Sequence, residues 1–111
     1  MKNYIQAGER LTLSAPYDVV SGGGLLVGSI FGVAIYDALS GVAVEAAVEG
    51  VFRMAKTSAQ AWTVGALIYW DNTNKVCTTT STSNKLIGVA MAVADNPSST
   101  GVVRLNGAFV G

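Results

Sequence analysis

The stretch that decides the fold is Val42-Ala43-Val44-Glu45-Ala46-Ala47-Val48-Glu49-Gly50-Val51-Phe52-Arg53-Met54. Its large apolar side chains fall mainly on even-numbered positions, whereas the charged side chains of Glu45, Glu49 and Arg53 all fall on odd-numbered ones. Because successive side chains of a strand point to opposite faces, this alternation is typical of a strand with one buried face.

A helix is the alternative for this stretch, because four apolar residues also form a stripe at helical spacing. The stripe consists of Val44, Ala47, Val48 and Val51. Two features favour the strand: valine loses rotamer freedom in a helix, and Glu45 and Glu49 would repel each other at positions i and i+4. Glycine weakens a strand interior, so we expect a bend or bulge at Gly50.

Runs of alternating or apolar residues on both sides of this stretch predict further strands. They span residues 9–14, 25–27, 29–36, 67–70, 75–80, 86–94 and 102–105. The run 86–94 is almost entirely apolar, so we expect a central strand that is buried on both faces. Turn-forming residues separate the runs, and no repeat period is evident. Many short strands at close spacing predict an all-β fold, namely a small β-sandwich or barrel.

One short helix is expected near residues 58–64. Thr57 and Gln60 have the spacing of a capping box, with Thr57 as N-cap and Gln60 three residues later. Gly65 suits the position just after a helix. A helix of one or two turns fits between them, and Trp62 on it would act as a plug over one open end of a sheet.

Length and composition limit the classes of protein to which the chain can belong. The 111 residues suit a single domain spanning 1–111. Seven basic and seven acidic residues give a net charge of zero, so a concentrated basic face for nucleic acid is not expected. The uncharged run 19–36 is interrupted by glycines, which argues against a membrane-spanning helix. The first ten residues lack the apolar core of a secretory signal.

No pattern in the sequence predicts catalysis, a cofactor or a metal site. The chain has no histidine, which excludes a Ser–His–Asp triad, and its one cysteine, Cys77, cannot form an internal disulfide. Gly23 and Gly28 have the spacing of a phosphate-binding loop, but the lysine that this motif requires after Gly28 is missing. Residues 71–74 predict a hairpin turn and not a calcium loop. We therefore expect a protein that is not an enzyme.

An apolar share of 50% with only 13% charged residues suggests that part of the surface is covered by other proteins. The candidate contact residues, for a partner or for an oligomer of the chain, are Tyr4, Ile5, Tyr17, Tyr36, Trp62, Trp70 and Phe109. Core positions are the alternative for Trp62 and Trp70. Residues 1–8 are expected to form an N-terminal arm that becomes ordered on binding.

The sequence resembles a known family along nearly its whole length. The resemblance lies in Tyr4-Ile5-Gln6-Ala7-Gly8, Leu11-Thr12-Leu13-Ser14-Ala15-Pro16, Val20 to Ala34, Glu49-Gly50-Val51-Phe52, Ala61-Trp62, Tyr69-Trp70-Asp71, Ile87-Gly88-Val89-Ala90 and Gly101 to Gly107. It is similar to the capsid cement, or decoration, proteins of tailed bacteriophages and prophages, which often carry a recombinase label.

The resemblance implies an all-β virion structural protein that binds the outside of the capsid and bridges major capsid subunits. It implies two partners, the major capsid protein and further copies of the chain, as a homotrimer or a dimer. It also implies synthesis in the bacterial host cytoplasm and no cofactor. The alternatives are another phage structural β module, associated with the tail or a fibre, and a small-ligand-binding β domain.

Overall fold

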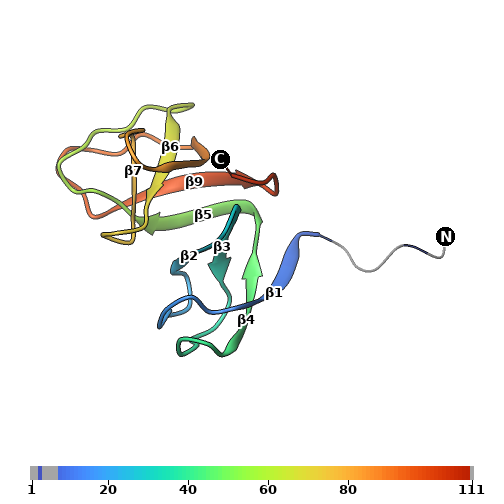
Figure 1. The fold of residues 1–111 in the computed structure, drawn as a ribbon. Helices are drawn as coiled ribbons and strands as arrows, with labels where there is room; N and C mark the ends of the chain where they lie inside the picture. The colour runs from blue at the N-terminus through green and yellow to red at the C-terminus, as the bar shows by residue number, and fades with distance from the viewer. Residues whose placement is uncertain (1–2, 4–7, 111) are drawn as a thin grey trace.

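The computed structural model describes residues 3 and 8–110, and these form two antiparallel sheets (Figure 1). The strands are β1 (Arg10–Ser14), β2 (Gly24–Val27), β3 (Ile30–Ala34), β4 (Ala43–Ala47), β5 (Glu49–Ala55), β6 (Leu67–Asp71), β7 (Val76–Thr78), β8 (Lys85–Ala90) and β9 (Thr100–Asn106). No helix occurs among these residues. The prediction of an all-β fold is confirmed.

The two sheets divide the chain into a first and a second half. The first sheet has the strand order β1-β4-β3-β2, and the second has the order β5-β9-β8-β6-β7. A parallel bridge between Lys56 and Cys77 brings the end of β5 to β7. This bridge curls the second sheet into a half-barrel.

The stretch 42–54 forms β4 and β5, so the strand interpretation is confirmed. The break falls at Val48, where the chain passes from the first sheet to the second. Gly50, where we expected the bend, lies inside β5 with a φ of 129°, a conformation that glycine adopts readily. The even-numbered residues Val44 and Met54 are buried, as the alternation predicts.

The predicted helix at 58–64 is wrong. Trp62 instead forms an antiparallel bridge with Ala94, in which its N–H donates to the Ala94 carbonyl at 2.9 Å and its carbonyl accepts from the Ala94 N–H at 3.1 Å. The Gln60 side chain accepts a bond from the Thr79 N–H at 3.0 Å and does not cap a helix. A helix of one or two turns is marginal on its own, so these long-range bonds prevail over the capping pattern.

The prediction for residues 86–94 is only partly correct. The strand β8 lies in the middle of the second sheet, but it ends at Ala90. Leu86, Met91 and Val93 are exposed, so the run is not buried on both faces. Leu86 is on the outer face of the curled sheet, whereas Met91 and Val93 follow the end of β8 and lie outside the sheet.

Two buried clusters correspond to the two halves of the chain. The larger cluster fills the half-barrel and takes in Phe31 and Val33 from β3. Its second-half members include Trp62, Ile68, Trp70, Cys77 and Val103. The smaller cluster lies on the other face of the first sheet and consists of Ala15, Val19, Leu25, Ala34, Val44 and Ala46. The first sheet is therefore covered on both faces, by the half-barrel and by its own loops.

Candidate interaction surfaces

Two loops of the first sheet repeat one sequence. Residues 17–22 read Tyr-Asp-Val-Val-Ser-Gly between β1 and β2, and residues 36–41 read Tyr-Asp-Ala-Leu-Ser-Gly between β3 and β4. The sequence analysis found no repeat period, and two copies of a short motif do not establish one. A six-residue motif with two variable positions is too short to stand out until the structure places the two copies together.

The backbones of the two loops are joined in a reciprocal way. Val19 and Ala38 exchange both backbone hydrogen bonds, each at 2.9 Å. Gly22 and Gly41 end the two motifs, and both have a φ of 84°. The Gly22 N–H donates to Ala34, and the Gly41 N–H donates to the equivalent Ala15, both at 2.8 Å. The two loops are thus related by an approximate local two-fold axis.

The side chains of the repeated aspartates follow the same symmetry. Asp18 Oδ1 accepts a hydrogen bond from the Ser40 backbone N–H at 2.8 Å. Asp37 Oδ1 accepts one from the Ser21 backbone N–H at 2.7 Å. Each carboxylate therefore fixes the end of the opposite loop. In the part of the chain that the structure describes, neither carboxylate is paired with a cation.

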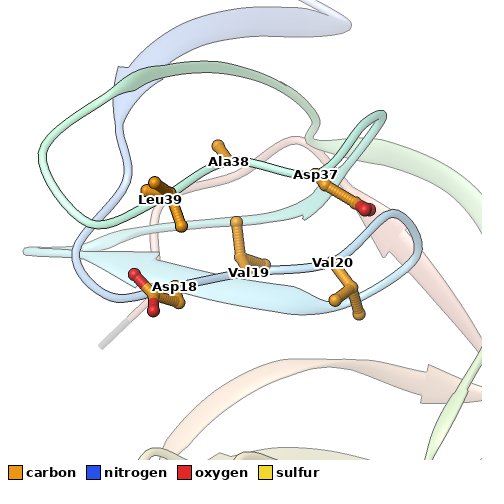
Figure 2. A pocket seen from close by; sticks show the side chains of 6 residues that line it. All are labelled: Asp18, Val19, Val20, Asp37, Ala38 and Leu39. Atoms are coloured by element: carbon orange, nitrogen blue, oxygen red, sulfur yellow. The ribbon is translucent and has the colours of Figure 1, made fainter.

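An open hollow of about 290 Å³ lies on this local axis. We call it the loop-tip hollow, and its lining residues are Asp18, Val19, Val20, Asp37, Ala38 and Leu39. Figure 2 shows the two segments running antiparallel, with the carboxylates at opposite ends. Val19 is buried, whereas Val20 and Leu39 are 66% and 68% exposed. The hollow therefore has an apolar wall, two exposed aliphatic side chains and an acidic group at each end.

The sequence analysis named none of these six lining residues as a candidate contact residue. It did name Tyr17 and Tyr36, which open the two motifs. The half-buried Tyr17 hydroxyl donates to the Gly24 carbonyl at 2.5 Å, and burial raises its pKa to about 12. Tyr36 is exposed, and its hydroxyl accepts a bond from the Glu45 N–H at 3.2 Å. The shared Tyr-Asp-x-x-Ser-Gly pattern marks both loops in the sequence, but it does not specify that they lie opposite each other.

The other candidate contact residues are divided between the core and the surface. Trp62 and Trp70 are 1% and 2% exposed, so they occupy core positions, and neither offers surface to a partner of this chain. Trp70 Nε1 donates to Asn72 Oδ1 at 3.0 Å, whereas the buried Trp62 Nε1 has no partner among residues 3 and 8–110. Tyr4 and Ile5 lie outside the described residues.

Phe109 is the most exposed large apolar side chain among the described residues, at 86%. Hollows of about 330 and 320 Å³ lie on its two sides. Leu67 and Leu86 line the first hollow, and Ile30 lines the second, and all three side chains are exposed. These four residues form the Phe109 surface, a second apolar area available to a partner.

Asp71 and Cys77 have structural roles. The Asp71 carboxylate accepts bonds from the Asn74 and Thr73 backbone N–H groups at 3.1 and 2.9 Å, and the bonds from Asn74 do most to lower the pKa of Asp71. These bonds form the turn between β6 and β7, which confirms the predicted hairpin. Cys77 is fully buried, and burial raises the pKa of its thiol to about 12.

Two further observations apply to residues 3 and 8–110 only. No three side chains of the metal-ligating types lie close enough together to hold an ion. None of these residues forms a helix with the length and hydrophobicity needed to span a bilayer. The loop-tip hollow and the Phe109 surface are thus two exposed apolar features of these residues. A further hollow, of about 470 Å³, is lined by polar residues that include Gln60, Thr78 and Asn84.

Comparison with known proteins gives one match. Neither the curated proteins nor the solved structures contain a significant match to the chain. A family model described as phage cement protein matches residues 5–105, which is most of the chain. This family consists of structural proteins of the phage capsid. The chain therefore belongs to the phage cement protein family.

Proposed function

We propose that this protein binds the outside of the phage capsid and stabilises it by bridging neighbouring major capsid subunits. The observation that carries the proposal is the family match over residues 5–105 together with two exposed apolar surfaces on an all-β chain. A bridging protein needs two contact regions and no reactive group. The loop-tip hollow belongs to the first half of the chain, and most of the Phe109 surface belongs to the second.

In this proposal copies of the chain also associate with one another, as a trimer or a dimer. Apolar side chains as exposed as Phe109 and Leu67 are common at such contacts, because burying them releases water. Many weak contacts, repeated over a shell, add up to strong attachment once each copy is held at two points. The near absence of net charge permits many copies to lie side by side.

The direct test is co-sedimentation with expanded shells of the major capsid protein of the same phage. We expect the purified protein to pellet with expanded shells at a fixed number of copies per subunit and to raise the temperature at which the shells disassemble. Unexpanded shells are the control. Failure to bind either shell, at protein concentrations well above those in an infected cell, would contradict the proposal.

A further inference from the structure

The loop-tip hollow has features that specify the chemistry of its partner. The hollow is apolar in its wall, and it is flanked by Val20 and Leu39, which both point their aliphatic side chains into solvent. Among the described residues, neither Val20 nor Leu39 belongs to a buried cluster. The buried Val19 beside them already supplies the contact with the smaller core cluster.

The two carboxylates of the hollow also indicate what kind of partner it binds. Asp18 and Asp37 each use Oδ1 to accept a backbone N–H from the opposite loop. Their Oδ2 atoms have no hydrogen-bond partner within residues 8–110. The hydrogen bonds between the loops hold both carboxylates in fixed positions, so each Oδ2 is a preorganised acceptor for a cation. A lysine or arginine of a partner would form a charge-assisted hydrogen bond with it.

We propose that the loop-tip hollow binds a segment of the major capsid protein in which an aliphatic side chain is flanked by lysine or arginine. The aliphatic group enters the hollow between Val20 and Leu39, and the cations meet Asp18 and Asp37. This proposal rests on the proposed attachment to the capsid and deepens it, since it assigns one surface and one kind of partner segment to that attachment.

Charge complementarity disfavours a symmetric contact between the loop-tip hollows of two copies of the chain. Two loop-tip hollows placed face to face would bring four carboxylates together, and like charges across an interface cost binding energy. Nucleic acid is disfavoured for the same reason, because its phosphates would face Asp18 and Asp37. A basic and aliphatic protein segment satisfies both the apolar wall and the two acids.

The test compares variants in binding to expanded shells of the major capsid protein. The D18N/D37N variant keeps each Oδ1 acceptor, so both loops keep their hydrogen bonds while the two charges are lost. We expect it to bind about tenfold more weakly at low salt and to lose most of the salt dependence that the unaltered protein shows. Leu39→Ser should weaken binding by a similar factor at every salt concentration.

Matched controls separate this surface from general effects. Val93 is 70% exposed, and Asp95 is also exposed. Neither residue lines the hollow, and both are far from its lining residues in the sequence. V93S and D95N should bind like the unaltered protein. If the unaltered protein binds shells but D18N/D37N and L39S bind equally well, the assignment of this surface is overturned while capsid attachment stands. If the unaltered protein does not bind, the proposed function itself fails.

Discussion

Phe31 of β3 and Trp70 of β6 pack with their ring centroids 4.9 Å apart and their planes tilted by 53°. This pair joins the first sheet to the half-barrel, because Phe31 reaches from one sheet into the core of the other. Gly24 on β2 lies against both rings. The absence of a side chain at Gly24 is therefore a condition for the contact between the two halves of the chain.

Replacing Gly24 with alanine should destabilise the protein. A Cβ atom at this position would lie 2.7 Å from the Trp70 ring and 2.8 Å from the Phe31 ring, so both rings would have to move. Overpacking of this kind costs about 1–3 kcal/mol. Urea unfolding followed by tryptophan fluorescence measures the loss. Gly8→Ala is the control, since a Cβ at Gly8 meets none of the described residues within 4 Å, and equal stability of the two variants would contradict the packing argument.

The strands could be predicted because their side-chain alternation records which face is buried. Val44 and Met54 show the pattern directly. The helix prediction failed because a capping box describes only local bonds, whereas Trp62 pairs with Ala94, far along the chain. The residue type of Trp62 permits two interpretations, a core position or a contact with a partner. Only the packing of the half-barrel, which buries Trp62, decides between them.

The candidate site was harder to predict than the fold. A hollow depends on which residues of two separate loops lie opposite each other, and the Val19–Ala38 pairing is a long-range contact that no local pattern specifies. Phe109 was predicted as a contact residue from its residue type alone, and the structure adds that its side chain is exposed. The aliphatic side chains of Val20 and Leu39 look like ordinary core residues in the sequence, and only their exposure in the fold marks them.

The local two-fold relation predicts equal effects at two glycines. Gly22 and Gly41 share a φ of 84°, and a Cβ at either position meets no atom within 4 Å in the described part of the chain. Substitution by alanine therefore brings backbone strain alone, about 1–2 kcal/mol at each position. Thermal unfolding of Gly22→Ala and Gly41→Ala should give the same loss within about 0.5 kcal/mol. A large cost at only one of them would show that the two loops are not equivalent.

Burial of Cys77 predicts a loss of stability at alkaline pH. The ordinary thiol pKa is 9.0, and burial raises that of Cys77 to about 12. The folded protein therefore keeps the thiol neutral, while the unfolded chain ionises it. The free energy of unfolding should be at its full value below pH 9 and should fall as the pH rises from 9 through 12. Denaturant unfolding at several pH values measures this fall.

The Cys77→Ala variant isolates the contribution of the thiol. Its alkaline fall should be smaller, but not absent, because burial also raises the pKa of Tyr17 to about 12 and acts in the same direction. In the unaltered protein, iodoacetamide at pH 8 should label Cys77 only after denaturant is added, since only the thiolate of an accessible cysteine reacts. Rapid labelling of the folded protein would refute the buried position.

Lys56 links two loops through its buried ammonium group. Its Nζ donates to the carbonyls of Thr57 at 2.7 Å, Ser98 at 3.2 Å and Ser58 at 3.4 Å. Lys56→Met would leave these acceptors without the cation, and we expect a loss of about 1–3 kcal/mol. Hydrogen exchange of the Ser98 amide, which donates to Ser58 at 3.1 Å, should accelerate. The exposed Lys75 provides the control, since Lys75→Met should leave this amide unchanged.

Substitution of Phe109 separates a role in association from a role in folding. Because its side chain is 86% exposed, Phe109→Ser should change the free energy of unfolding by less than about 0.5 kcal/mol. If copies associate through the Phe109 surface, the same variant should sediment as a smaller species than the unaltered protein at equal concentration, since an aromatic side chain at the centre of a contact contributes strongly to binding. Analytical ultracentrifugation measures this directly. If the variant forms the same oligomer as the unaltered protein, the contact between copies does not involve Phe109. The Phe109 surface would then be available for the capsid.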